Sequence, residues 1–153
     1  MSTDYTVIMV QKHQFGDDPG IFKNVESDVT FEGPTMIDVL FDCPNINPAL
    51  TAVLMFQSRD VEFLRNILRI NDVDVPGALA ESAAVKPTTS ELAGWNGTIQ
   101  IIDPRHNLKA TGNRLHVEAR NSGGGGGGEL DDFILDNMVI MYKTLPRQPA
   151  NQI

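Results

Sequence analysis

Residues 112–120, GNRLHVEAR, alternate strictly between apolar and polar positions. In an extended chain, Leu115, Val117 and Ala119 fall on one side, while Arg114, His116 and Glu118 fall on the other. Alternation with a period of two is typical of a β-strand with one buried and one solvated face. The pattern therefore predicts a strand here, with its three apolar side chains in the core.

Other β-rich segments recur along the chain between turn signals, and helical periodicity is scarce. They span residues 6–12, 28–32, 35–41, 49–58, 64–75 and 98–103, and the segment 64–75 reads as two strands that turn at Asn71-Asp72. The apolar segment 49–58 is expected to be covered on both faces. Eight or nine strands at this spacing predict an all-β fold, a jelly-roll β-sandwich of two antiparallel sheets. Residues 1–145 would form this single domain, and residues 146–153 a polar tail.

The closing segment, residues 133–142, is apolar on both faces. Simple alternation places Phe133, Leu135, Val139 and Met141 on one face, and Ile134, Met138, Ile140 and Tyr142 on the other. A strand of a sandwich ordinarily buries one face, so the second needs a cover. The long segment 76–97, the tail or another subunit can supply it, and a homo-oligomer is therefore one hypothesis.

The charge and the composition argue against two classes of protein, those that bind nucleic acid and those that span a membrane. The net charge of −8 and the pI near 4.7 argue against binding nucleic acid through its phosphates. No apolar run approaches the ~20 residues of a membrane helix, and the first residues lack the features of a signal peptide. We expect no membrane span, and a protein that is cytoplasmic or is exported without a cleavable signal peptide.

The glycine run and the single cysteine each have a functional and a structural interpretation. The glycine run 123–128 resembles a phosphate-binding loop. However, acidic residues follow it in place of the Lys-Ser/Thr of such loops, so a flexible connection is favoured. Cys43 is the only cysteine, which excludes an intrachain disulfide. A small buried apolar residue is the favoured interpretation of Cys43, with a reactive thiol as the alternative.

No catalytic or zinc-binding pattern is evident. His13, His106 and His116 lack ligand spacing, and neither a G-x-S-x-G segment nor a Cys–His signature is present. Pairs of carboxylates, which glycoside hydrolysis would need, are present, but an acidic chain contains such pairs by chance. The sequence therefore predicts a protein that is not an enzyme.

Three segments resemble the galactose-binding-domain-like jelly roll that is found in many carbohydrate-binding modules. They are residues 67–77 (ILRINDVDVPG), 109–120 (KATGNRLHVEAR) and 132–142 (DFILDNMVIMY), and Asp72 stands where the family usually has glycine. The resemblance implies a two-sheet sandwich that binds its ligand at loops along one edge. It also implies one structural calcium ion, for which the predicted oxygen ligands are Asp17, Asp18, Glu32 and Asp132, with Glu26 and Asp131 as further candidates. The alternative is that these acids are a solvated turn and a charged strand entry.

Trp95, the single tryptophan, lies in the glycine-flanked segment AGWNG. An aromatic ring on a loop can stack on a sugar, and Asn96 beside it can bond to hydroxyl groups. The alternative is that Trp95 caps the core. We therefore predict a non-catalytic, lectin-like carbohydrate-binding module with Trp95 and Asn96 as ligand-binding residues. The alternative function is a structural or assembly subunit of a homo-oligomer or particle.

Overall fold

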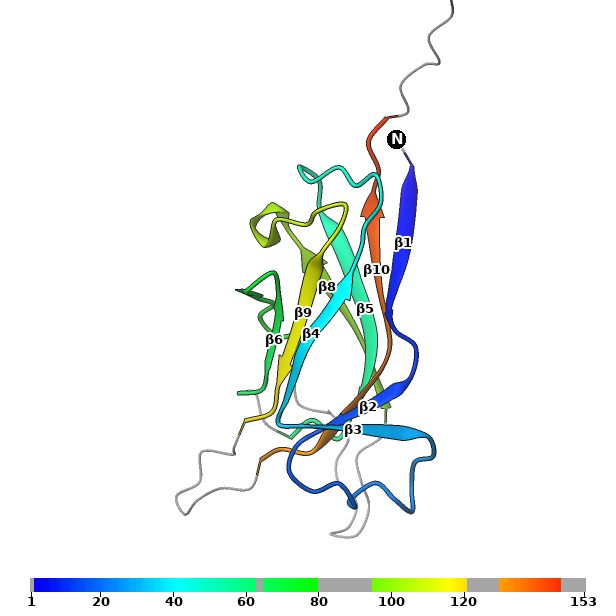
Figure 1. The fold of residues 1–153 in the computed structure, drawn as a ribbon, viewed down its shortest axis with the longest axis vertical. Helices are drawn as coiled ribbons and strands as arrows, with labels where there is room; N and C mark the ends of the chain where they lie inside the picture. Colours follow the sequence, from blue (N-terminus) through cyan, green and yellow to red (C-terminus); the bar gives the residue numbers. More distant parts are fainter. Residues whose placement is uncertain (1, 63–64, 80–94, 121–129, 147–153) are drawn as a thin grey trace, which may run out of the picture.

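The structure is a computed structural model that describes residues 2–62, 65–79, 95–120 and 130–146, without the side chains of residues 37 and 38. These residues form ten strands and one short 3₁₀ helix, η1 (Figure 1). The elements are β1 Thr3–Met9, β2 Lys12–Phe15, β3 Val29–Gly33, β4 Thr35–Phe41, β5 Ala52–Arg59, β6 Ile67–Ile70, β7 Val73–Asp74, β8 Trp95–Ile102, η1 Pro104–His106, β9 Asn113–Glu118 and β10 Phe133–Lys143.

The strands pair into two sheets. The larger sheet has the order β3-β2-β10-β5-β8, and β1 joins it on β10, while the smaller has the order β4-β9-β6-β7. The described pairs are antiparallel except β2 with β3, which cross the lower end of the sandwich in Figure 1. From β4 onward the chain passes from one sheet to the other at almost every connection, as in a jelly roll. The predicted all-β jelly-roll sandwich is confirmed.

Strand β9 matches its prediction residue by residue. Leu115, Val117 and Ala119 are buried, Arg114 is exposed, and His116 and Glu118 are half-buried. Across the small sheet, Leu115 pairs with Val39 of β4 and Ile70 of β6. The inward face of β9 is therefore part of the main core.

The predicted turn between β6 and β7 is also confirmed. Asn71 and Asp72 both have positive φ angles, 51° and 65°, in the left-handed region that Asn and Asp tolerate. The carboxylate of Asp72 accepts a hydrogen bond from Arg114 at 2.8 Å. Asp72 thus adopts the conformation for which glycine is usual, and its side chain adds a link to β9.

The predicted faces of β10 were wrong. Asn137, with φ of 52°, lies in a bulge where the register to β5 shifts between Asp136 and Val139. The extra residue reverses the alternation, so that one set of side chains enters the main core along the whole strand: Phe133, Leu135, Met138, Ile140 and Tyr142. Val139 and Met141 point to the outer face instead, since they pair with the outward Met55 and Val53.

Strand β5 also differs from its prediction. Ala52, Leu54, Phe56 and Ser58 are buried, whereas Val53, Met55 and Arg59 are half-buried and Gln57 is exposed. Only its inward face is therefore in the main core, and its outward residues are at most half-buried.

Cys43 is fully buried, as favoured by the sequence, and burial raises the pKa of its thiol to about 11. The thiol is therefore protonated at neutral pH. The glycine run, the tail beyond residue 146 and most of the long segment 76–97 lie outside the described residues. Where the chain is described, no helix is long and apolar enough to span a bilayer.

Candidate functional site

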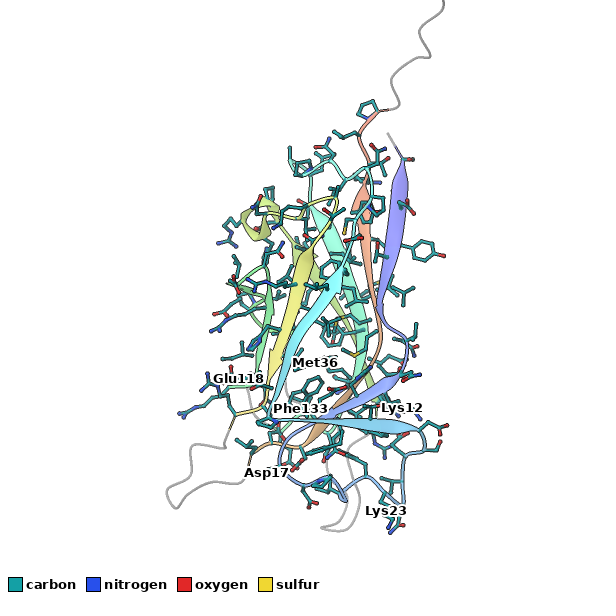
Figure 2. The ribbon with its side chains drawn as sticks, in the orientation of Figure 1. Lys12, Asp17, Lys23, Met36, Glu118 and Phe133 are labelled. Carbon is teal, nitrogen blue, oxygen red and sulfur yellow. The ribbon has the colours of Figure 1, made fainter. Side chains whose placement is uncertain are left out.

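The carboxylate of Glu26 joins three strands at the lower end of the larger sheet. Glu26 belongs to the β2–β3 segment, residues 16–28, whose Asp17 and Lys23 lie at this end in Figure 2. Its Oε2 accepts a hydrogen bond from Lys12 Nζ at 2.8 Å, and its Oε1 accepts one from Trp95 Nε1 at 3.0 Å and another from Arg59 Nη1. Since the donors come from β2, β8 and β5, this one side chain ties the segment across the sheet.

The β2–β3 segment covers this end of the outer face. Arg59 pairs with both Trp95 and Ile134 in neighbouring strands, so these three side chains share the outer face. Ile134 is nevertheless 0% exposed, and Phe22 of the segment is also buried. Neither belongs to the main core cluster. The lower end therefore has a small hydrophobic layer of its own outside the sheet.

The charge of Glu26 is stabilised by its donors. Burial alone would raise the pKa of this carboxyl, but the hydrogen bonds from Lys12 and Arg59 outweigh it and lower the pKa. Glu26 is therefore an ionised acceptor at neutral pH. Its bond to Nε1 fixes the orientation of the Trp95 indole, which is half-buried.

The structure separates Trp95 from Asn96. The two are consecutive residues of β8, so their side chains point to opposite faces of the sheet. Asn96 pairs with Ser58, whose side chain is on the buried face of β5. Asn96 therefore does not extend the surface of Trp95, contrary to the sequence-based pairing of these residues.

Other polar groups do lie beside Trp95 on the outer face. Gly97, the next outward position of β8, pairs with Gln57, which pairs in turn with Asp136. Asn137 Nδ2 donates a hydrogen bond to Gln57 Oε1 at 3.2 Å. Among the described residues, nothing lies within 4 Å of where a Cβ on Gly97 would be, so this part of the chain leaves the space next to the indole open. Gln57, as the one polar outward residue in an apolar run, was the signal that sequence reasoning missed.

Three of the four predicted calcium ligands meet at one corner of the sandwich. Oδ1 of Asp132 accepts hydrogen bonds from Asp18 N at 3.0 Å and Gln14 Nε2 at 3.2 Å, and Asp17 Oδ2 accepts one from Leu130 N at 3.0 Å. Glu32 instead pairs with His13 at 2.7 Å. Among the described residues, no group of three or more His, Cys, Asp or Glu side chains is arranged to hold a metal ion. The residues therefore do not fit calcium in this arrangement.

Asp132 has an unusual acidity. Burial, with a smaller contribution from the negative charges of Asp17 and Asp18, raises the pKa of its carboxyl to about 6 against the effect of the two hydrogen-bond donors. Gly16 packs so closely that a Cβ there would lie 2.0 Å from Asp132 Oδ1. The backbone N–H of Asp18 thus fixes the start of the β2–β3 segment, as Glu26 fixes its end.

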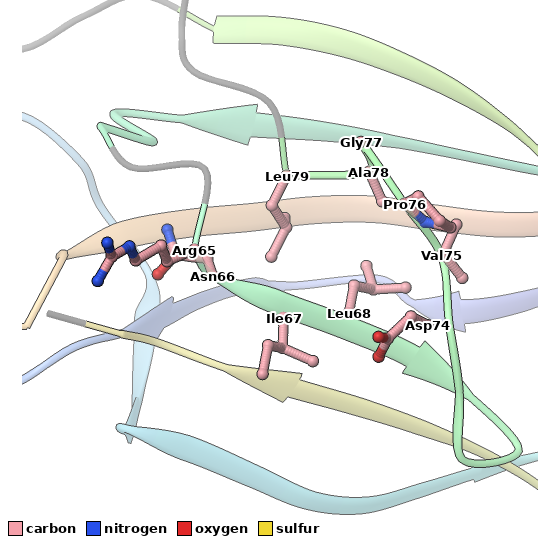
Figure 3. A pocket seen from close by; sticks show the side chains of 10 residues that line it. All are labelled: Arg65, Asn66, Ile67, Leu68, Asp74, Val75, Pro76, Gly77, Ala78 and Leu79. Carbon is pink, nitrogen blue, oxygen red and sulfur yellow. The ribbon is translucent and has the colours of Figure 1, made fainter. Parts of the chain in front are cut away.

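A pocket of about 400 Å³ lies between β6 and residues 74–79 (Figure 3). Leu68 and Leu79 point into it, and Arg65 and Asn66 form one end. The Asn66 amide is already engaged, because it donates to Asp131 Oδ2 at 2.6 Å and accepts from Arg120 N at 2.9 Å. No aromatic side chain is among its described lining residues, so it offers no stacking surface.

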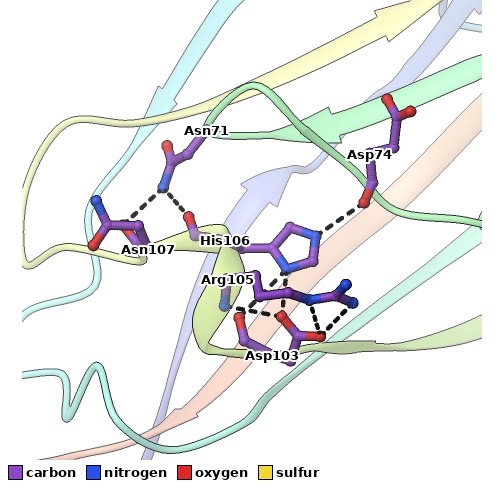
Figure 4. Close-up of polar contacts among 6 residues, drawn as sticks. All are labelled: Asn71, Asp74, Asp103, Arg105, His106 and Asn107. Atoms are coloured by element: carbon purple, nitrogen blue, oxygen red, sulfur yellow. Dashed lines mark hydrogen bonds and ion pairs between the residues drawn. The ribbon is translucent and has the colours of Figure 1, made fainter.

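The polar cluster around η1 has a structural role (Figure 4). Arg105 donates two hydrogen bonds to Asp103 Oδ2, at 2.9 and 2.7 Å, and these lower the pKa of Asp103 to about 2. The buried His106 ring lies between the backbone oxygens of Asp103 and Asp74, at 3.3 and 3.1 Å. These contacts hold η1 against the β7 end of the small sheet.

Comparison with known proteins gives a likeness to solved structures. No family model matches the chain, and no curated protein matches it. Among the solved structures, one described as a family 35 carbohydrate binding module from an environmental isolate is similar over 95% of this chain and 100% of its own, with a TM-score of 0.40 and 15% sequence identity.

Proposed function

We propose that this protein is a non-catalytic carbohydrate-binding module, and that a sugar ring stacks on Trp95 at the outer face of the larger sheet. The observation that carries the proposal is the fixed, half-buried indole of Trp95, held by Glu26 beside the open position of Gly97. A ring fixed before binding loses little conformational entropy when a ligand arrives. The apolar face of a pyranose needs such a ring and open space next to it.

The neighbouring amides supply the polar half of the site. Gln57 and Asn137 are exposed side chains on the strip that continues from Trp95 past Gly97. Amides both donate and accept hydrogen bonds, as hydroxyl groups of a sugar require. In this proposal Gln57 and Asn137 take the role that the sequence suggested for Asn96.

The charges near Trp95 favour binding over hydrolysis. Glycoside hydrolysis needs a carboxylic acid with a raised pKa as proton donor and a second carboxylate opposite it. The pKa of Glu26 is lowered, and its two oxygens accept hydrogen bonds from three side chains. Glu26 is therefore suited to positioning the indole and not to proton transfer.

The test is a glycan array on the purified protein, followed by affinity electrophoresis in gels that contain the best polysaccharide. Trp95→Ala should weaken retention about tenfold or more, a loss of roughly 1.4 kcal/mol or more. Trp95→Phe keeps an aromatic ring but lacks the Nε1 donor. Its retention should lie between that of the unaltered protein and that of Trp95→Ala. Gly97→Val, which fills the open position without touching the core, should also weaken binding.

Leu40→Ala is the matched control, since Leu40 is an exposed apolar residue of β4 in the opposite sheet. Circular dichroism melts will verify that each variant is folded. Binding that survives both Trp95→Ala and Gly97→Val would exclude this site. If the unaltered protein retains no glycan, the proposed function itself is wrong.

A further inference from the structure

The upper part of the outer face is an unbroken apolar surface. Cross-strand pairs place Tyr5, Met141, Val53 and Ile101 in one row, and Val7, Val139, Met55 and Ile99 in the next. Directly paired residues project from the same face of a sheet. These eight side chains, which we call the apolar patch, therefore extend over β1, β10, β5 and β8.

Much of this patch is exposed to solvent. Ile99 is 72% exposed, Ile101 66% and Tyr5 64%, and no described segment covers them. With strands ~4.8 Å apart and rows ~7 Å apart, the two apolar rows occupy roughly 270 Å² of the sheet, and one polar row on either side extends the surface to roughly 500 Å². An exposed apolar patch of a few hundred Å² on a soluble protein is often functional. Two such surfaces together reach the ~1,000 Å² at which specific interfaces begin.

We propose that the apolar patch is a homodimer interface, in which two copies of this chain pack the larger sheets face to face. The charges at its two ends make the patch complementary to itself. Lys143 follows the upper row on β10, and Asp136 precedes the lower row on the same strand. A two-fold axis that runs across the strands, between the rows, exchanges the rows and brings Lys143 of each copy opposite Asp136 of the other.

Other occupants fit the patch less well. Its two rows contain one hydroxyl group and no amide, so they offer little to a sugar, and the net charge of −8 disfavours nucleic acid. Sheets that pack face to face are a standard arrangement, with the strands aligned within about 30°. Gln57 and Gly97 form the polar row at the lower rim of this interface and Trp95 lies beyond it, so a second copy and a sugar stacked on Trp95 would compete for that row.

The test is sedimentation equilibrium of the full chain over a range of concentrations. The unaltered protein should approach twice its 16.8 kDa mass, with a dissociation constant on the order of micromolar for an interface of this size. Ile99→Lys should leave a folded monomer, because a charge would be buried between the two copies. Its melting temperature should match that of the unaltered protein at concentrations low enough for both to be monomeric, since association itself raises apparent stability. The matched control, Leu40→Lys, places the same charge on β4 and should remain a dimer.

A charge exchange tests the orientation of the two copies. Lys143→Asp and Asp136→Lys should each weaken the dimer about tenfold, and the double variant should recover most of the loss. A monomer at ~100 μM, well above the expected constant, would overturn the proposal. It would also be overturned if Ile99→Lys still dimerised, or if the double variant showed no recovery. Glycan binding by Trp95 does not enter any of these readouts, so the two proposals fail separately.

Discussion

The two ends of the outer face of the larger sheet differ in how far their apolar side chains are shielded from solvent. At the lower end, the β2–β3 segment covers Ile134 and is held in place by Asp132 at its start and Glu26 at its end. At the upper end, Ile99 and Ile101 lie bare on neighbouring positions of β8. The apolar character of both ends is similar, but among the described residues only the lower end receives cover from its own chain. Apolar sequence on an outward face thus does not by itself indicate whether the same chain covers it.

The largest expected effect compares two isoleucines on this one face. Ile134→Ala should lower the free energy of unfolding by about 2–5 kcal/mol, because it leaves a cavity under the β2–β3 segment. Ile99→Ala should change it by less than about 0.5 kcal/mol under conditions where the protein is monomeric. Urea unfolding at low protein concentration measures both. Equal losses at the two positions would remove the distinction between a covered and a bare end.

Asp132→Asn tests the start of the β2–β3 segment. Asparagine keeps the Oδ1 acceptor for Asp18 N and Gln14 but cannot ionise. Because folding raises the pKa from 3.8 to about 6, the ionised carboxylate destabilises the fold, and stability is lost as pH rises through about 6. The variant should therefore be more stable than the unaltered protein at pH 8, by on the order of 2 kcal/mol.

Well below the unfolded pKa of 3.8 the stability difference between Asp132→Asn and the unaltered protein should vanish, since Asp132 is then protonated in both the folded and unfolded states. Thermal melts from about pH 2.5 to about pH 8 measure this. A variant that is less stable at pH 8 would show that the charge of Asp132 is favourable in the fold.

Glu26→Gln tests the end of the same segment, with the opposite dependence on pH. Folding lowers the pKa of Glu26 below its ordinary 4.5, so its contribution is present above that pH and is lost as the solution becomes more acidic. The variant should cost about 1–2 kcal/mol at pH 7, since Lys12 and Arg59 are only partly exposed and lose a charged acceptor. Its indole fluorescence should also change. Lys109→Gln, an exposed charge on another connection, is the matched control.

The smallest expected effect concerns calcium. Because the carboxylates of Asp17, Asp18 and Asp132 accept N–H donors and are not arranged as one ligand shell, neither millimolar calcium nor a chelator should shift the melting temperature measurably. Differential scanning calorimetry is the measurement. A calcium-dependent rise that Asp132→Asn abolishes would show that this corner rearranges around the ion, as the family resemblance implies.

The sequence predicted the parts of the fold that depend on local patterns. Strand β9 follows from unbroken alternation, and the β6–β7 turn follows from two residues that tolerate positive φ. The faces of β10 were mispredicted beyond Asp136, because one bulged residue reverses the alternation without changing the composition. The contacts of Glu26 were out of reach for another reason. Its partners Arg59 and Trp95 are 33 and 69 residues away along the chain, and no local pattern records such pairing. Trp95 was selected from its type and flanking glycines, whereas Gln57 and Asn137 required the sheet register.

The bulge at Asn137 makes β10 intolerant of a change in length. Removing Asn137 would restore plain alternation, so either the upper or the lower half of the strand would turn its apolar side chains outward. A deletion here would thus be more damaging than an exchange for another residue that accepts positive φ, and related chains should keep the spacing at this point and favour Asn, Asp or Gly there. For protein engineering, the two halves of β10 are separate modules: each can receive a new outward surface while the inward residues stay fixed, provided that the residue between them remains.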